Sequence, residues 1–257
     1  MTLNRKLFWL VPAGVLLVWE IASRTGIIPA LFFPPPSSIL AAFVNLIASG
    51  RLAVHLGTTL LRLGLGFVLG AIPGIAIGLA MGWSPDLHAL LDPFVSALHP
   101  IPKIAIFPLI MIIFGLGDMS KIVIIAITVF FPVLINSMVG VHQLNPVYFE
   151  VTKNYGASRW LTFKRLVLPG SLPMILAGIR IALNMALMVT VMVELLNANQ
   201  GLGVLLWFDW ETLHVPELYA VLVVIALVGL VINTLLPKWL SRLAAWHEFH
   251  PGEQATS

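Results

Sequence analysis

Apolar residues gather into six stretches, and nearly all charged residues lie between these stretches or at their ends. A helix needs about 20 mostly apolar residues to cross the hydrocarbon core of a bilayer. The pattern therefore predicts an all-α, polytopic membrane protein with about six transmembrane helices. The predicted spans are residues 7–22, 58–83, 87–117, 121–141, 172–196 and 218–237.

The first and third of these stretches are irregular. The first has the basic-then-apolar order that is also typical of a signal peptide. Glu20 and Arg24 follow it without a clear small-x-small cleavage site, so we expect a retained helix. The third stretch contains several prolines, which predicts a kinked or interfacial lead-in over residues 85–103 and a deep part over residues 104–117.

Lysine and arginine predict the orientation, because loops on the cytoplasmic side carry an excess of both. With a cytoplasmic N-terminus, the inside segments hold eight basic residues, and the long outside stretch 197–216 holds none. Six spans then place both termini in the cytoplasm. The inside basic residues are Arg5, Lys6, Lys153, Arg159, Lys164, Arg165, Lys238 and Arg242.

We predict a single transmembrane domain over residues 1–257. Residues 1–54 form the first span and an outside linker, and residues 55–240 form the core of the domain. The core includes an inside loop, residues 142–170, which is long enough to be functional. Residues 241–257 form a cytoplasmic tail.

The outside linker is predicted to contain a short helix. Three prolines are followed by Ser37 and Ser38, and either serine suits the N-cap of a helix that begins near Ile39.

Glycine recurs every fourth residue through the second span, which places the glycines on nearly one face of a helix. Small residues let the backbone of another membrane helix approach closely. We interpret the row as a packing surface; the alternative is a sliding or gating seam. The row consists of Gly66, Gly70, Gly74, Gly78 and Gly82.

The inside loop has the pattern of a helix, a glycine turn and a second helix. Asn145 suits an N-cap for a first helix over residues 147–154, and Gly156 suits the left-handed turn that follows. Ser158 is the expected cap of a second helix, residues 159–168, which should stop at Pro169 and Gly170. From the pattern alone, an interfacial helix pair that only joins two spans remains an alternative.

Composition limits the class of protein. The chain is 59% hydrophobic and only 10% charged, against roughly 25% charged in soluble domains, which excludes a disordered chain and a water-soluble globule. The net charge is +3, but the basic residues are scattered between apolar stretches and form no basic face, so no nucleic-acid partner is expected. The sequence lacks cysteine, which excludes a disulfide, a thiolate metal site and a cysteine nucleophile. It also contains no phosphate-binding Gly-x-x-x-x-Gly-Lys-Ser/Thr, so the chain is not expected to be an ATPase itself.

The inside loop resembles the EAA motif of ABC importer permeases. Glu150 and Gly156 match its first half, and Leu168 and Pro169 match its Ile-x-Leu-Pro end, while residues 151–152 replace the two alanines. Further segments resemble the nitrate, sulfonate, taurine and bicarbonate branch of these permeases, so that the likeness covers residues 34–240. These segments are residues 55–62 with the glycine row that follows them, residues 100–103, 114–121, 130–132 and 201–203, and Trp207.

The resemblance implies a type I importer (MetI-like) permease fold in the bacterial cytoplasmic (inner) membrane. It implies a second permease subunit, most simply in a homodimer, two ATPase subunits that bind ATP and Mg²⁺, and a periplasmic substrate-binding protein. The cargo would be a small anion such as nitrate, bicarbonate, taurine or an aliphatic sulfonate. The residues implied in ATPase coupling are Glu150, Lys153, Tyr155, Gly156, Ala157, Ser158, Leu168 and Pro169.

Polar groups within spans are costly and are therefore candidates for the translocation path. Arg62 has the fork geometry that suits an oxyanion, or it snorkels to the interface. Glu194 is a gate or a contact with the binding protein, or a helix-end carboxylate bonded to a neighbouring span. The other three candidates are neutral polar residues, and such residues more often join helices than bind a ligand. They are Asn136, Asn184 and Thr190.

Trp207, Asp209 and Trp210 form a cluster in the outside stretch. Anchoring at the membrane interface is the usual role of tryptophan, and docking of the binding protein is the alternative.

Two other functions compete with import by a motor-driven permease. A stand-alone channel or secondary transporter is compatible with six spans and a broken third helix, but it does not require so apolar an inside loop. An intramembrane enzyme is disfavoured because the spans lack paired His or Asp motifs.

Overall fold

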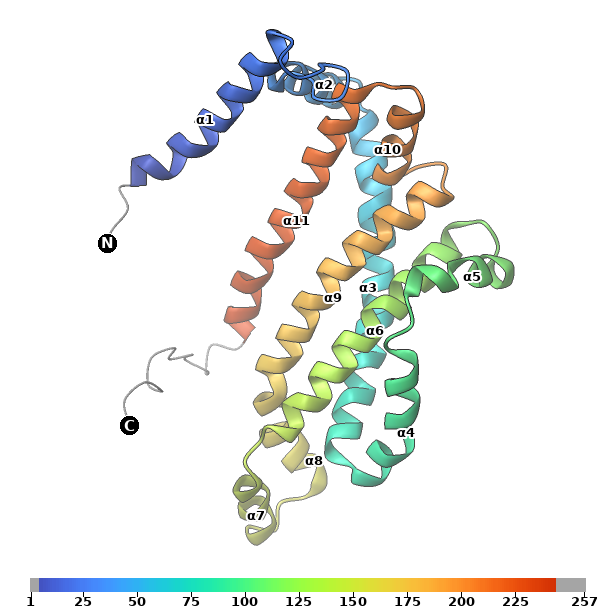
Figure 1. Ribbon diagram of the computed structural model, residues 1–257. Coiled ribbons are helices and arrows are strands. Elements are labelled where there is room, and N and C mark those ends of the chain that lie inside the picture. Colours follow the sequence, from blue (N-terminus) through green and yellow to red (C-terminus); the bar gives the residue numbers. More distant parts are fainter. Residues whose placement is uncertain (1–4, 244–257) are drawn as a thin grey trace. The chain divides into compact units, whose positions relative to one another are not determined.

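The structure is a computed structural model that describes the backbone of residues 5–243 and the side chains of residues 10–235. The described part consists of helices without strands (Figure 1). Residues 244–257, most of the predicted cytoplasmic tail, lie outside it. The elements are α1 (Arg5–Arg24), α2 (Pro36–Ala48), α3 (Arg51–Trp83), α4 (Pro85–Leu98), η1 (Lys103–Ile106), α5 (Phe107–Phe114), α6 (Asp118–His142), α7 (Pro146–Asn154), α8 (Arg159–Thr162), η2 (Phe163–Val167), α9 (Leu168–Leu196), α10 (Leu202–Glu211) and α11 (Val215–Leu243).

Four helical stretches within the described residues are long and apolar enough to cross a membrane: Arg51–Trp83, Asp118–His142, Arg159–Leu196 and Val215–Leu235. They confirm the second, fourth, fifth and sixth predicted helices. The third is broken as predicted, because α4 and the η1–α5 pair meet at a bend of 85°. The first predicted span coincides with α1, whose first side chains lie outside the described residues, and it stays a prediction.

Contacts divide the chain into two compact units. One unit contains the residues up to Leu61 together with Val191–Val228, and the other contains Arg62–Thr190 together with the residues from Gly229 onward. Helices α3, α9 and α11 therefore contribute residues to both units.

The glycine row of α3 packs against α6, within the second unit. A Cβ atom added at Gly74 would lie 2.9 Å from the carbonyl oxygen of Phe130, and one added at Gly82 would lie 2.8 Å from that of Met138. The other three glycines of the row are equally close to α6. The structure thus confirms the packing interpretation, since the backbones approach too closely for any larger residue.

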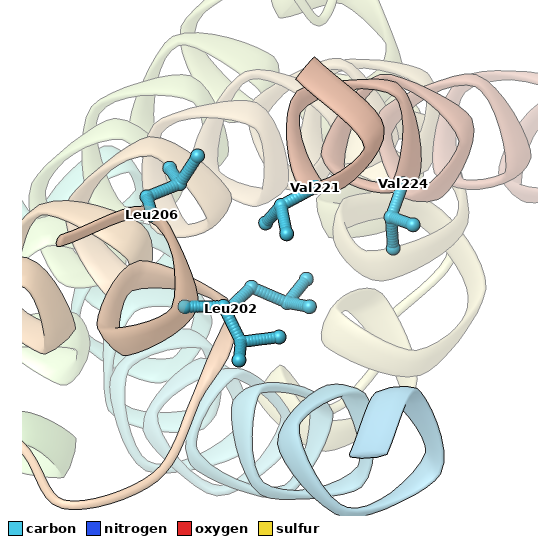
Figure 2. Close-up of a cluster of buried hydrophobic side chains, with 5 residues drawn as sticks. Leu202, Leu206, Val221 and Val224 are labelled. Atoms are coloured by element: carbon cyan, nitrogen blue, oxygen red, sulfur yellow. The ribbon is translucent and has the colours of Figure 1, made fainter. Parts of the chain in front are cut away.

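The first unit has its own apolar core, in which α10 packs against α11. Figure 2 shows this cluster and labels four of its side chains, two from each helix. They are Leu202, Leu206, Val221 and Val224. The sequence analysis missed α10, because a ten-residue apolar run without a polar face has no helical periodicity to detect.

The prediction that the second loop helix ends at Pro169 and Gly170 is wrong. α8, the π-helical turn η2 and α9 form one continuous helix, Arg159–Leu196. Pro169 lies in the first turn of α9, directly after the wider π turn, which accommodates a residue without an N–H whose ring would crowd a regular helix. Gly170 packs against Leu144: a Cβ atom there would lie 2.5 Å from a terminal methyl carbon of Leu144, which would have to move aside.

The predicted serine cap of the outside helix is also wrong. Pro35 occupies the N-cap of α2 and makes no side-chain cap bond. The cap comes instead from α1, because the Glu20 carboxylate accepts the Ser37 N–H at 3.0 Å and the Ser37 hydroxyl at 2.7 Å. A carboxylate 17 residues away satisfies a free N–H at the start of α2 and complements the helix dipole.

Candidate functional site

The inside loop folds as a capped helix, a left-handed turn and a second capped helix. The Asn145 side chain accepts the Val147 N–H at 3.0 Å, and the Ser158 hydroxyl accepts the Leu161 N–H at 3.2 Å. Gly156 has φ of +65°, a conformation that favours glycine. These caps confirm the predicted local pattern, and Figure 1 shows α7 and α8 at the end of α6, where the chain turns back into α9.

Two phenylalanines pack the inside loop against the ends of the membrane-spanning helices. Phe149 of α7 and Phe163 of η2 both pack against one cluster of buried side chains from α3, α6, η2 and α9: Leu79, Val141, Val167 and Ile175. Phe163 also stacks on Trp83 of α3, with ring centroids 5.7 Å apart. A displacement of α7 must therefore displace the ends of these spans as well, since packed interiors deform little.

The opposite side of α7 carries exposed apolar side chains, which we call the α7 patch: Val147, Tyr148, Val151 and Tyr155. Tyr155 is the most open of them, with 87% of its surface exposed. Glu150 and Lys153 are exposed on the same helix. An exposed apolar patch of this kind marks a contact with a protein partner or with a membrane, and the α7 patch is therefore a candidate docking surface.

The eight residues that the family resemblance singles out fall in two places. Six lie on α7 or in the turn to α8, where Ala157 is half-buried and Ser158 serves as the cap. The other two, Leu168 and Pro169, lie in the first turn of α9. Of the first group only Tyr155 belongs to the α7 patch, and the others lie beside it; the second group lies where the inside loop continues into a span.

Glu194 is a buried carboxylate at the end of α9, with 1% of its surface exposed. The Thr59 hydroxyl of α3 lies 3.0 and 2.8 Å from its two carboxylate oxygens, and the Gly203 N–H donates at 3.2 Å. The Leu202 N–H in turn donates to the Thr59 hydroxyl at 2.9 Å. A side chain at Gly201 would collide with the Glu194 carboxylate, which explains the Gly-Leu-Gly sequence.

We predict that Thr59→Val lowers the stability of the protein by about 1–3 kcal/mol, because a buried carboxylate loses a hydrogen-bond donor. The measurement is the thermal unfolding of the purified chain in detergent. Thr234→Val is the matched control: the exposed Thr234 bonds only to carbonyl groups of its own helix, and its loss should be nearly neutral. Equal effects of the two changes would contradict the prediction.

Arg62 is buried in the second unit and does not snorkel. Its Nε and Nη2 donate to one carboxylate oxygen of Asp118 at 2.9 and 2.6 Å. Asp118 begins α6, where a carboxylate also complements the helix dipole. The sequence analysis missed this partner, because the two residues lie 56 positions apart.

The three neutral polar candidates bond within or between helices. Asn136 and Thr190 each donate to the carbonyl four residues earlier, at 2.8 and 2.7 Å. Asn184 of α9 and Asn233 of α11 exchange two hydrogen bonds of 3.2 and 2.8 Å through their side-chain amides. This geometry fits helix association, and a contact with cargo stays a prediction for all three.

The outside aromatic cluster lies on α10. Trp207 and Trp210 are exposed, with ring centroids 4.9 Å apart. Asp209 between them is 4% exposed, so its carboxylate is not offered to a docking protein in this structure. Burial raises the pKa of Asp209 from 3.8 to about 6; the positive charges of Arg51 and His214 lower it and the Glu217 carboxylate raises it, both less strongly.

The raised pKa makes stability depend on pH. Folded Asp209 holds its proton up to a pH of about 6, whereas the unfolded residue loses it near 3.8, so stability should fall as the pH rises through this window. We expect Asp209→Asn to weaken that fall and to be the more stable protein at pH 7. Thermal unfolding from pH 4 to pH 7 measures both effects, with Glu211→Gln, an exposed carboxylate of the same helix, as control. An unchanged pH profile would contradict it.

Among the described residues, no group of three His, Asp or Glu side chains is close enough to hold a metal ion. The described site thus consists of a candidate docking surface and of polar groups that are hydrogen-bonded within the protein.

Comparison with known proteins agrees with this architecture. Residues 66–245 match the family of binding-protein-dependent transport system inner membrane components. The chain belongs to this family: it is the permease component of an ABC importer, a multi-pass protein of the MetI-like type.

Individual relatives cover nearly the whole chain. The putative aliphatic sulfonates transport permease protein SsuC of Bacillus subtilis is 32% identical over 243 residues, 95% of this chain and 88% of its own length. The taurine transport system permease protein TauC of Escherichia coli is 33% identical, over 91% of this chain and 87% of its own length. The formylaminopyrimidine transport permease protein ThiX of Halalkalibacterium halodurans is 30% identical over 96% of both chains.

Proposed function

We propose that this chain is one of two identical permease subunits that import a small organic sulfonate, such as taurine or an aliphatic sulfonate, across the bacterial cytoplasmic membrane. Two of the similar relatives carry these substrates in their names, which supports a sulfonate over nitrate or bicarbonate. A periplasmic binding protein would deliver the cargo, and both termini would lie in the cytoplasm, as the distribution of Lys and Arg predicts.

The α7 patch is the observation that carries the proposal. A rigid helix with an apolar outer side, joined through Phe149 and Phe163 to four helical elements of one unit, can transmit the motion of a partner to the spans. The chain contains no phosphate-binding loop, so the partner would be a separate ATPase that binds ATP and Mg²⁺. Alternating access then follows from rigid-body motion of packed helices.

Uptake of labelled taurine into proteoliposomes tests the function. The permease is reconstituted with its cognate ATPase and binding protein, and ATP is supplied on the ATPase side. We expect uptake that requires both partners and that excess alkanesulfonate suppresses. Uptake without the ATPase would show a channel or secondary transporter instead. Suppression by nitrate, bicarbonate or formylaminopyrimidine, but not by alkanesulfonate, would refute the substrate class.

A further inference from the structure

Two adjoining hollows lie where α3 meets the inside loop, within the second unit. One has a volume of about 490 Å³ and the other about 600 Å³. They share three lining residues, Ala80, Trp83 and Arg159, so they form one continuous depression. We call the two parts the apolar hollow and the polar hollow.

The apolar hollow runs along a membrane-spanning helix. Ala76, Leu79 and Ala80 lie three and four residues apart and thus line one face of α3. Three aromatic rings also line it: Phe163 stacks on Trp83 of α3 and on Trp160, with ring centroids 5.7 and 5.8 Å apart. Aliphatic side chains and flat aromatic rings thus line the apolar hollow, which we call the slot, and such walls suit a hydrocarbon chain.

The polar hollow is enclosed by the α3–α4 corner and the inside loop. Lys153 and Arg159 bring two positive charges to its wall, and Asp86 brings one negative charge. Neither basic side chain has a hydrogen bond or ion pair with any residue of the described part. The hollow therefore has a net positive charge and two cations available to a ligand.

Arg159 lies at the junction of the two hollows, where apolar walls give way to polar ones. A ligand that fills both needs a hydrocarbon tail, and next to the tail an anionic group for a guanidinium to bind. Trp83 and Trp160 at the same level are residues typical of the boundary between lipid tails and headgroups.

We propose that this depression binds an anionic phospholipid of the cytoplasmic leaflet, with one acyl chain in the apolar hollow and the phosphate on Arg159 and Lys153. Basic pockets beside transmembrane helices on the cytoplasmic side are the sites where such headgroups bind. The inference uses the orientation proposed above, but it does not depend on the identity of the cargo. A bound lipid would hold the inside loop against the end of α3.

Quenching of tryptophan fluorescence by brominated lipids tests the proposal, because Trp83 and Trp160 line the slot. The full-length permease, with its ATPase, is placed in vesicles that contain brominated phosphatidylglycerol or brominated phosphatidylcholine. We expect stronger quenching by phosphatidylglycerol, and a loss of this preference by about fivefold in Arg159→Gln, the effect of one basic group near an anionic surface. Arg159→Lys should restore most of it.

Arg165→Gln is the matched control. It removes the same charge six residues later in the same helix, and Arg165 does not line either hollow. The double change of Trp83 and Trp160 to Phe should abolish the difference between the lipids, and millimolar inorganic phosphate should not compete. Equal quenching by both lipids, or an equal loss in Arg159→Gln and Arg165→Gln, would overturn the proposal. Quenching that is unchanged when Trp83 and Trp160 are replaced by Phe would mean that lipid does not reach the depression and that a protein covers it.

Discussion

Replacing Gly70 by alanine should prevent the stable packing of α3 against α6. The added methyl group would lie 2.9 Å from the Val129 Cβ atom and closer still to the Ala126 carbonyl oxygen, so the two helices would have to separate. Overpacking of this kind costs about 1–3 kcal/mol, and more where the obstacle is backbone. We expect a low yield of folded protein in membranes and a lower unfolding temperature in detergent.

Gly64→Ala is the control for this change. Gly64 lies on the same helix, and a Cβ atom there would meet nothing within 4 Å. Alanine also has the higher helix propensity, so this variant should be neutral or slightly more stable. If Gly64→Ala and Gly70→Ala behave alike, the glycine row is not a packing surface.

Replacing Tyr155 by aspartate should uncouple the permease from its ATPase. The side chain is 87% exposed at the end of the α7 patch, so the change leaves the interior of the permease untouched. If Tyr155 is buried in a partner, its replacement by a charge costs about 2 kcal/mol or more, which is about thirtyfold in affinity. We expect the ATPase to be lost in a pull-down and uptake to fall by a similar factor.

The conservative change Tyr155→Phe keeps the ring and should retain both association and uptake. Membrane insertion and unfolding temperature should be equal for the three proteins. ATPase capture that is unchanged by Tyr155→Asp would place the docking surface elsewhere and would remove the main support for the proposed coupling.

Local chemistry was sufficient to predict several features of the structure. The caps at Asn145 and Ser158 and the left-handed turn at Gly156 involve residues no more than three positions apart in sequence. The same holds for the periodicity of the glycine row, which repeats within one helix. Such patterns depend on short-range geometry, so they can be predicted from the sequence without knowledge of the tertiary structure.

Other features depend on residues that are distant in sequence. The pairs Arg62–Asp118 and Thr59–Glu194 join positions 56 and 135 residues apart, and the cap of α2 comes from Glu20. Nothing in the local sequence of one partner specifies the other, and the same polar residue can snorkel, bind cargo or join helices.

The sequence by itself determined the class of protein, the apolar helices and the turn chemistry of the inside loop, because hydrophobicity and capping act over a few residues. Only the tertiary structure decided that the helix runs on through Pro169, that Asp209 is buried, and that two hollows adjoin at Arg159. Each of these depends on which elements pack together, and packing is set by the shape of surfaces from distant segments.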